Sequence, residues 1–240
     1  MAMNDYGYGL WFLVVVDTAV VLLFAVSFYH PQTRRDWKAF GAFSGFIVAL
    51  FTEMYGFPLT VYLLSSWLGN TFLGLDLTHN GGHLWAKLLG WKGDPHLSPF
   101  HIASYVAIIA GFWLIAAAWR VLYASQRAAR LARTGPYAHI RHPQYAGFLF
   151  IMVGFLLQWP TIPTLILFPV LVLVYRRLAI REEREVAERL GAQWGIYASK
   201  TPRFIPHVRG HQSKRLDVEE GRGVPAAAEP DGRPIYPNRV

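Results

Sequence analysis

The sequence predicts an all-α integral membrane protein with about five transmembrane segments, a C-terminal helical hairpin and a cytoplasmic amphipathic helix. Composition indicates the class, because 53% of the 240 residues are hydrophobic and only 16% are charged, which is too apolar for an ordinary soluble domain. Long apolar runs indicate the number of segments, and the arginines between them indicate the topology.

Three apolar runs in the first 118 residues are each long enough to cross about 30 Å of hydrocarbon as a helix. They are residues 10–28, 39–68 and 100–118. The second run contains Glu53 near its middle and a possible kink at Pro58. An acid inside a membrane span is a candidate functional group. Glu53 is therefore expected either to line the substrate pocket or to hydrogen-bond a neighbouring helix.

Residues 145–175 form a fourth apolar stretch, whose length predicts a hairpin of two short helical arms. Its 31 residues are too many for one straight span and too few for two full spans of about 20 residues each. Pro160 and Pro163 stand in its middle and favour a turn or a break there.

The distribution of arginine supports the hairpin and predicts the orientation. Five arginines and no acidic residue lie between Arg120 and Gln144, and another basic loop contains Arg34, Arg35 and Lys38. The positive-inside rule makes both loops cytoplasmic, and a hairpin returns the arginines after residue 175 to the same side. We therefore expect the N-terminus outside and the C-terminus in the cytoplasm. The net charge of +8 reports this topology, and no nucleic-acid partner is expected.

The chain ends in an amphipathic segment and a polar tail. Residues 180–200 carry large apolar side chains at spacings of four, four and three, which predict a helical stripe. These side chains belong to Val186, Leu190, Trp194 and Tyr197. Gly191 and Gly195 are expected to interrupt this helix. We divide the chain into N-terminal transmembrane helices (1–118), a core (119–206) and a tail (207–240) whose composition predicts disorder.

Polar residues gather on both sides of the predicted hairpin, which would bring its two ends together. The sequence "RHPQYAG" precedes the hairpin, Glu182 and Glu183 follow it, and Tyr197 and Arg203 come later. Each element alone has a plain explanation, since an acidic run often begins a solvated helix and an Arg-His-Pro turn often lies at a membrane edge. Their combination in this order is more specific.

The stretches "RTGPYAHIRHPQYAGFLFIMVGFLLQ" and "REEREVAERLGAQWGIYASKTPRFIP" resemble the isoprenylcysteine carboxyl methyltransferase and phospholipid methyltransferase superfamily. The shared pattern is RHPxYxG, a hydrophobic hairpin, a Glu-Glu pair, a tyrosine-containing helix and a closing PRFIP, over roughly residues 120–206. The resemblance implies an integral membrane methyltransferase that uses S-adenosylmethionine. Its acceptor would be lipid-like or a small thiol, amine or carboxylate, with membrane lipids around it.

The resemblance also implies roles for individual residues. The cofactor pocket would be formed by the RHP turn (residues 141–143), the acidic pair (Glu182 and Glu183) and the last helix. Its residues would be Tyr137, Arg141, His142, Pro143, Tyr145, Gly147, Glu182, Glu183 and Tyr197. Arg203, Glu183 and His142 would be catalytic. A general base would help if the acceptor is an amine or a thiol, and the candidates are His142 and Glu183.

Four histidines lie near one another between the second and third apolar runs: His79, His83, His96 and His101. Histidines four residues apart on a helix can bind a metal, but Gly81 and Gly82 oppose a helix, and no acid or cysteine completes an obvious set. We therefore predict a polar loop that caps the outer side of the bundle, and no metal site. The alternative to an enzyme is a non-enzymatic membrane protein of the same fold that handles metal through this loop.

Overall fold

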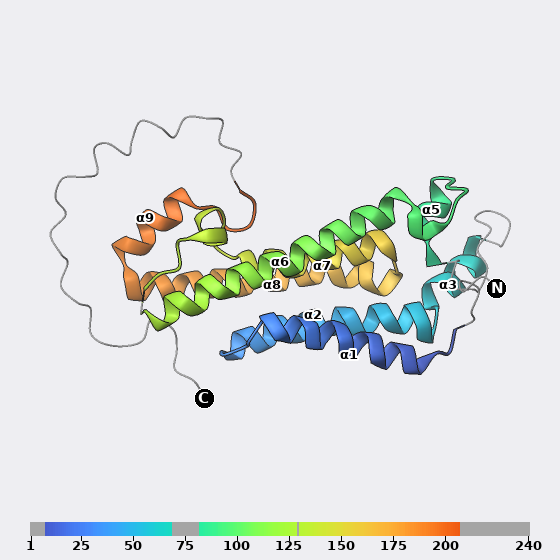
Figure 1. Ribbon diagram of the computed structural model, residues 1–240, viewed down its shortest axis with the longest axis horizontal. Coiled ribbons are helices and arrows are strands. Elements are labelled where there is room, and N and C mark those ends of the chain that lie inside the picture. Colours follow the sequence, from blue (N-terminus) through green and yellow to red (C-terminus); the bar gives the residue numbers. More distant parts are fainter. Residues whose placement is uncertain (1–7, 69–81, 129, 207–240) are drawn as a thin grey trace.

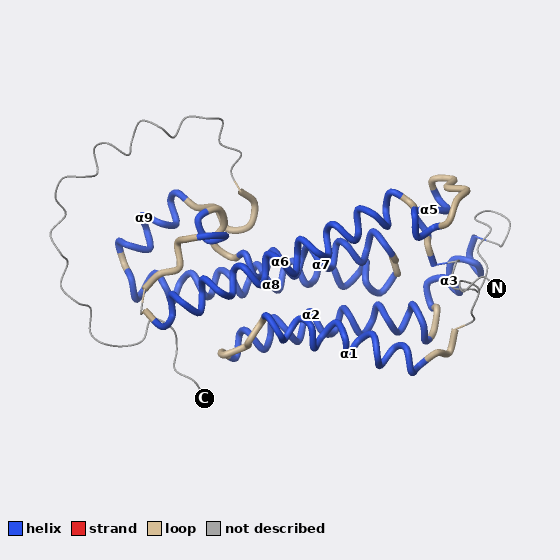
Figure 2. Tube along the Cα trace, viewed as in Figure 1, coloured by secondary structure: helices blue, strands red, loops and turns tan. Residues whose placement is uncertain are grey.

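The computed structural model of the protein describes residues 8–68, 82–128 and 130–206, which form an elongated bundle of helices (Figure 1). In chain order the elements are α1 (Trp11–Phe28), α2 (Arg34–Phe51), the π-helical turn η1 (Thr52–Gly56), α3 (Leu59–Leu68), α5 (Leu84–Leu88), η3 (Pro95–Leu97), α6 (Pro99–Arg127), η4 (Gly135–Ala138), α7 (Pro143–Gln158), α8 (Ile162–Leu190) and α9 (Ala192–Lys200). These residues contain no β-strand (Figure 2), which confirms the predicted all-α class.

Four segments of the described chain are long and apolar enough to cross a membrane: α1, the Arg34–Gly56 segment made of α2 and η1, α6 and α8. The protein is therefore a multi-pass integral membrane protein. Helix α7 is also apolar but has 16 residues, fewer than the roughly 20 of a full span. The count of five segments, the membrane hairpin of α7 and α8, and the orientation of the termini stay predictions.

The second apolar run is broken near Pro58, as its sequence predicts. Proline lacks an amide N–H and disfavours helical backbone in the residue before it, and Phe57 is accordingly extended with φ −128°. Helix α3 begins directly after this break. The buried Glu53 accepts a hydrogen bond from the backbone N–H of Thr60 at 3.0 Å, so this acid holds the start of α3.

The C-terminal helices differ from the prediction. Helix α8 continues through the charged segment to Leu190, so the acidic pair lies in its second half and does not begin a separate helix. Beyond Pro169, which lies inside the helix, its leucine, arginine, glutamate and alanine residues favour helix, and no further proline or glycine occurs before Gly191. At Gly191 the backbone reaches φ +49°, which favours glycine, and the helix ends. Gly195 lies within α9 and does not interrupt it.

Glycines allow α6 and α7 to pack closely. A Cβ atom built on Gly147 would lie 2.5 Å from Ile115 Cγ1 and 2.9 Å from the carbonyl oxygen of Gly111. Small residues at such interfaces let membrane helices approach each other. Helix α6 also continues across the boundary at residue 118, so the N-terminal helices and the core share one helix.

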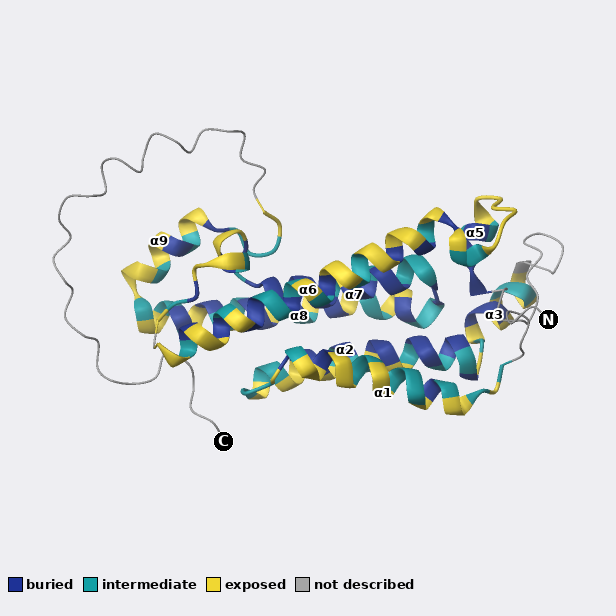
Figure 3. Cartoon of the chain, viewed as in Figure 1, coloured by how far each residue is buried: buried dark blue, intermediate teal, exposed yellow. Residues whose placement is uncertain are grey.

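Aromatic rings join α2 to α7 and α8 in the middle of the bundle. The ring centroid of Phe148 lies 4.9 Å from that of Phe43 and 6.0 Å from that of Tyr175. The hydroxyl of Tyr175 donates to the carbonyl oxygen of Ala39 at 3.1 Å. Buried residues face the neighbouring helices, and exposed ones cover the outer faces (Figure 3). This packing fixes the N-terminal end of α2 beside the charged half of α8.

Candidate functional site

Three segments meet at the end of the bundle that carries η4 and α9 (Figure 1). The RHP turn gives His142 as the N-cap of α7 and Pro143 at its first position, where a missing N–H costs nothing. The backbone N–H groups of Arg141 and His142 donate to the carbonyl oxygens of Pro202 and Arg203 at 2.9 and 3.2 Å. The "PRFIP" segment is therefore tied to the RHP turn by the backbone itself.

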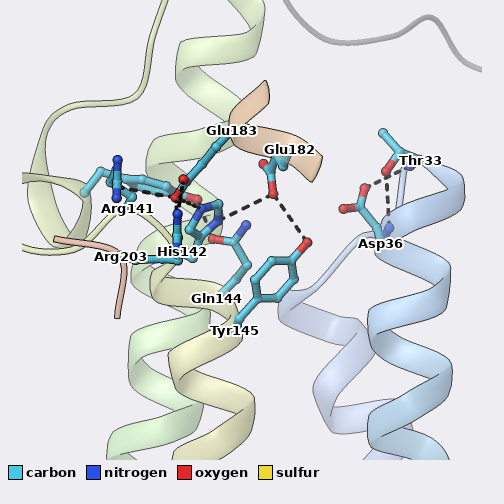
Figure 4. Close-up of polar contacts among 10 residues, drawn as sticks. Thr33, Asp36, Arg141, His142, Gln144, Tyr145, Glu182, Glu183 and Arg203 are labelled. Carbon is cyan, nitrogen blue, oxygen red and sulfur yellow. Dashed lines mark hydrogen bonds and ion pairs between the residues drawn. The ribbon is translucent and has the colours of Figure 1, made fainter. Parts of the chain in front are cut away.

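Glu183 lies at the centre of a network of cationic groups (Figure 4). Arg203 binds it with two hydrogen bonds, Nε to Oε1 at 2.9 Å and Nη2 to Oε2 at 2.6 Å. His142 Nε2 lies 3.0 Å from the same Oε1, and Arg141 Nε lies 3.4 Å from it. The carboxylate of Glu183 thus joins α8, the RHP turn and the C-terminal segment.

Glu182 has looser contacts than its neighbour. The hydroxyl of Tyr145 donates to Oε2 at 3.4 Å, and His142 Nδ1 lies 3.5 Å from the same oxygen (Figure 4). The side chain of Glu182 is 26% exposed, against 11% for Glu183. Carboxylates accept several hydrogen bonds, so Glu182 keeps capacity for a ligand, whereas Glu183 is already saturated.

His142 stands between the two carboxylates and is buried. Burial is the largest influence on its pKa and lowers it, but the hydrogen bonds and charges of Glu182 and Glu183 together raise the pKa above its ordinary value of 6.5. The ring is therefore held in its protonated form over a wider pH range than a free histidine. A protonated imidazole cannot accept a proton, so His142 acts as a base only above its raised pKa.

A second set of contacts fixes α9 over the RHP turn. The hydroxyl of Tyr197 donates to the carbonyl oxygen of Tyr137 at 2.7 Å, and the hydroxyl of Tyr137 donates to Gln144 Oε1 at 2.8 Å. Burial raises the pKa of Tyr197 to about 12, so its phenol remains a donor. The guanidinium of Arg141 lies 5.7 Å from the ring centroid of Trp194, within the range of a cation–π contact.

Two residues expected at the site lie elsewhere. Gly147 faces Gly111 and Ile115 of α6, so its described contacts are those of helix packing. Glu53 follows Asp36 by 17 residues along α2 and η1, which is about 25 Å at the rise of a helix, so it belongs to the opposite end of the bundle. The remaining expected residues are brought together in one group, called the charged cluster below. Its members are Tyr137, Arg141, His142, Pro143, Tyr145, Glu182, Glu183, Tyr197 and Arg203.

The start of α2, for which no functional role was predicted, borders the same cluster. Arg35 forms an ion pair with Glu185 of α8, and Thr33 and Asp36 form a capping box at the start of α2. A small cavity of about 40 Å³ lies here. It is lined by Thr33, Arg35, Asp36, Leu122, Gln126, Gln144, Tyr145, Glu182, Glu185, Val186 and Arg189. The pattern Thr-x-x-Asp predicts the cap of α2, but it does not predict that Arg35 meets Glu185 on the distant helix α8.

A larger apolar groove adjoins the cluster on the side of α6 and α7. Its volume is about 780 Å³, within the usual range for ligand sites. Its lining residues are Trp113, Leu114, Ala117, Gly135, Pro136, His139, Ile140, Ala146, Leu149, Phe150, Val153, Phe204, Ile205 and Pro206. Ile140 and Phe204 directly neighbour Arg141 and Arg203 in the chain, so the groove borders the charged cluster.

Fold and site together define a helical membrane protein with a buried charged cluster at one end of its bundle. The model of the isoprenylcysteine carboxyl methyltransferase (ICMT) family matches residues 100–188. This match confirms the resemblance seen in the sequence, because residues 100–188 are similar to the isoprenylcysteine carboxyl methyltransferase family. The matched segment contains the RHP turn, α7 and the acidic pair, whereas Tyr197 and Arg203 follow it. A comparison with curated proteins finds no match.

Proposed function

We propose that the protein is an integral membrane methyltransferase that takes its methyl group from S-adenosylmethionine and transfers it to an acceptor with an apolar part. The observation that carries this proposal is the acidic pair of α8, held against the RHP turn within the segment that matches a methyltransferase family. The acceptor class rests on the apolar groove beside that pair.

The residues of the cluster fit the polar groups of this cofactor. Glu182 offers carboxylate oxygens with spare capacity for an ammonium or hydroxyl group. Arg141 Nε and His142 Nδ1 are buried and lie 3.4 and 3.5 Å from the carboxylates of Glu183 and Glu182, at the long end of ion-pair distances. Both nitrogens are donors that suit the carboxylate of S-adenosylmethionine. The cavity beside Glu182 is smaller than the 300–1,000 Å³ typical of ligand pockets, so binding requires the surrounding side chains to move.

What S-adenosylmethionine supplies when bound is a methyl group already activated on a positively charged sulfur. Glu182 would balance that charge and orient the polar groups. Glu183 would act indirectly, because it fixes His142 and Arg203 in place. A saturated carboxylate is a weak proton acceptor, so a general base, if the acceptor needs one, is His142 above its raised pKa.

The apolar groove would hold the lipophilic part of the acceptor and direct its reacting atom toward the cluster. Alignment of two reactants in a site that excludes water can lower a bimolecular barrier by about 7–11 kcal/mol. A lipid amine, a prenylated carboxylate and a hydrophobic thiol all meet this description.

Two measurements test the proposal. Calorimetry on the detergent-purified protein, with a chelator present, should show binding of S-adenosylmethionine and of its demethylated product. Transfer of labelled methyl to a panel of lipid, prenyl-thiol and small-thiol acceptors should then identify the acceptor class. Absence of binding by both forms of the cofactor would favour the non-enzymatic alternative. Preference for small polar acceptors would overturn the role of the groove.

A further inference from the structure

A cluster of three histidines lies at the end of the bundle opposite the charged cluster, near α5 and the start of α6 (Figure 1). His83 is the N-cap of α5, His96 belongs to η3 and His101 lies in the first turn of α6. One ring nitrogen of each lies within 4.8 Å of those of the other two. His83 and His101 are 2% and 1% exposed, so the cluster is largely buried.

The distances within this cluster fit a metal better than a hydrogen bond. Zinc binds imidazole nitrogen at about 2.0–2.1 Å in a tetrahedron, which sets neighbouring ligand atoms about 3.3–3.4 Å apart. His96 Nδ1 and His101 Nε2 are 3.4 Å apart, which is longer than the usual hydrogen bond of about 2.7–3.2 Å. The nitrogen of His83 lies within 4.8 Å of the other two, so a shift of at most about 1.4 Å completes the same spacing.

Local caps fix the backbone of two of the histidines. Asp94 Oδ1 accepts the backbone N–H of His96 at 2.9 Å, and Ser98 Oγ accepts that of His101 at 3.4 Å. Because the caps act on the backbone, they fix where these two imidazole rings start without using their ring nitrogens.

Helix α7 fixes the third histidine. The rings of His83 and Trp159 lie 4.6 Å apart between centroids. Gly82 packs so closely on the same indole that a Cβ atom would lie 1.9 Å from Trp159 Cζ2. Trp85 Nε1 also donates to the carbonyl oxygen of Leu156 at 2.9 Å. The three histidines therefore lie on three separate elements, each held by local contacts, and such support favours a metal site.

The donor set selects the kind of ion. The group contains three imidazoles and, among the described residues, no carboxylate. Imidazole suits zinc, copper, nickel and iron, whereas magnesium and calcium require oxygen ligands. Three protein ligands leave one tetrahedral position for water or an exogenous ligand.

We propose that His83, His96 and His101 bind one divalent transition-metal ion, with Zn²⁺ as the ion of best geometric fit. The bound ion links α5, η3 and α6 at the end of the bundle away from the charged cluster. This site is separate from the proposed methyltransferase function. It replaces the metal-free loop that the sequence alone favoured.

The test uses the full chain in detergent, with any affinity tag removed so that no other polyhistidine competes. After treatment with a chelator and its removal, the protein is titrated with Zn²⁺ by calorimetry and with Co²⁺ by absorption spectroscopy. We expect one bound equivalent, visible bands typical of four-coordinate Co²⁺, and a higher thermal transition with Zn²⁺. Stabilisation by a ligand of the folded state grows with its concentration above Kd.

Variants identify the ligands. His83→Gln, His96→Gln and His101→Gln should each weaken Zn²⁺ binding at least tenfold, whereas the exposed His30→Gln should leave it unchanged. His96 is the least buried of the three, so His96→Gln remains informative if the other two variants fail to fold. Each variant is first compared with the parent by its thermal transition in chelator. No bound equivalent in the parent protein would overturn the proposal, as would equal affinities of the parent and His96→Gln.

Discussion

The two adjacent glutamates of α8 should differ in what their loss affects. Glu183→Gln removes the negative charge from a carboxylate that contacts Arg203, His142 and Arg141. Arg203 is 32% exposed, so solvent screens this pair and its loss costs about 1 kcal/mol. His142 is 3% exposed, and its hydrogen bond to a charged group contributes about 1.5–3 kcal/mol. The free energy of unfolding should therefore fall by about 3 kcal/mol.

Glu182→Gln should weaken mainly the binding of the cofactor and affect stability little. Its contacts within the protein are 3.4 and 3.5 Å long, so the variant should lose about 1 kcal/mol of stability or less. If Glu182 binds S-adenosylmethionine through a charged hydrogen bond, the loss of about 1.5–3 kcal/mol corresponds to a roughly ten- to hundredfold weaker Kd. Glu183→Gln should weaken binding as well, because His142 and Arg141 lose their anchor.

Glu188→Gln is the matched control, since Glu188 is exposed in the same helix. Its effect on stability should stay below about 0.5 kcal/mol. Thermal unfolding in detergent reports stability, with a shift of about 6–12 °C for a loss of about 3 kcal/mol, and calorimetry reports Kd. Equal losses of stability in Glu182→Gln and Glu183→Gln would refute the separate roles. Equal losses of affinity in all three variants would remove the acidic pair from the site.

The other predictions concern pH, helix packing and the tail. The folded-state pKa of His142 lies above 6.5, so its protonation stabilises the protein fully below pH 6.5, and this contribution is lost as the pH rises through the raised pKa. The temperature of the thermal transition should therefore fall less between pH 6 and 9 in His142→Gln than in the parent protein. Identical pH dependences of the two proteins would contradict this prediction. Gly147→Ala should cost about 1–3 kcal/mol of stability because its Cβ meets Ile115 and the backbone of α6. The control Gly45→Ala has open space around its Cβ and should be neutral or slightly stabilising. Equal thermal transitions of the two variants would show that Gly147 has no packing role. A chain that ends at Val208 should bind S-adenosylmethionine as the full chain does, because the described contacts of the C-terminal segment end by residue 206. Calorimetry measures this binding, and a truncated protein that folds but no longer binds would show that the tail contributes to the site.

Helix positions and most residues of the charged cluster could be predicted from the sequence because their signals are local. Apolar runs predicted the spans, Pro58 predicted the break before α3, and arginine marked the end of the bundle where Arg35 meets Glu185. The RHPxYxG pattern and the acidic pair predicted the similarity to a methyltransferase family that the match over residues 100–188 confirms. The expected disorder of residues 207–240 and any role of His79 lie outside the described residues.

Only the tertiary structure decided which partner each polar residue has. Successive residues of a helix point about 100° apart, so Glu182 and Glu183 enter different surroundings although their sequence positions are equivalent. Gly147 belongs to the family pattern, yet its position on α7 turns it toward α6.

The histidines illustrate the same limit at the other end of the bundle. Their spacing of 13 and 5 residues matches no metal-binding motif on one helix, so the sequence alone favoured a loop without metal. Helix α5, η3 and the first turn of α6 converge there because Gly82 and Trp85 attach the connecting segment to the end of α7. Contacts between distant segments depend on the direction and rotation of whole helices, which composition and periodicity do not encode.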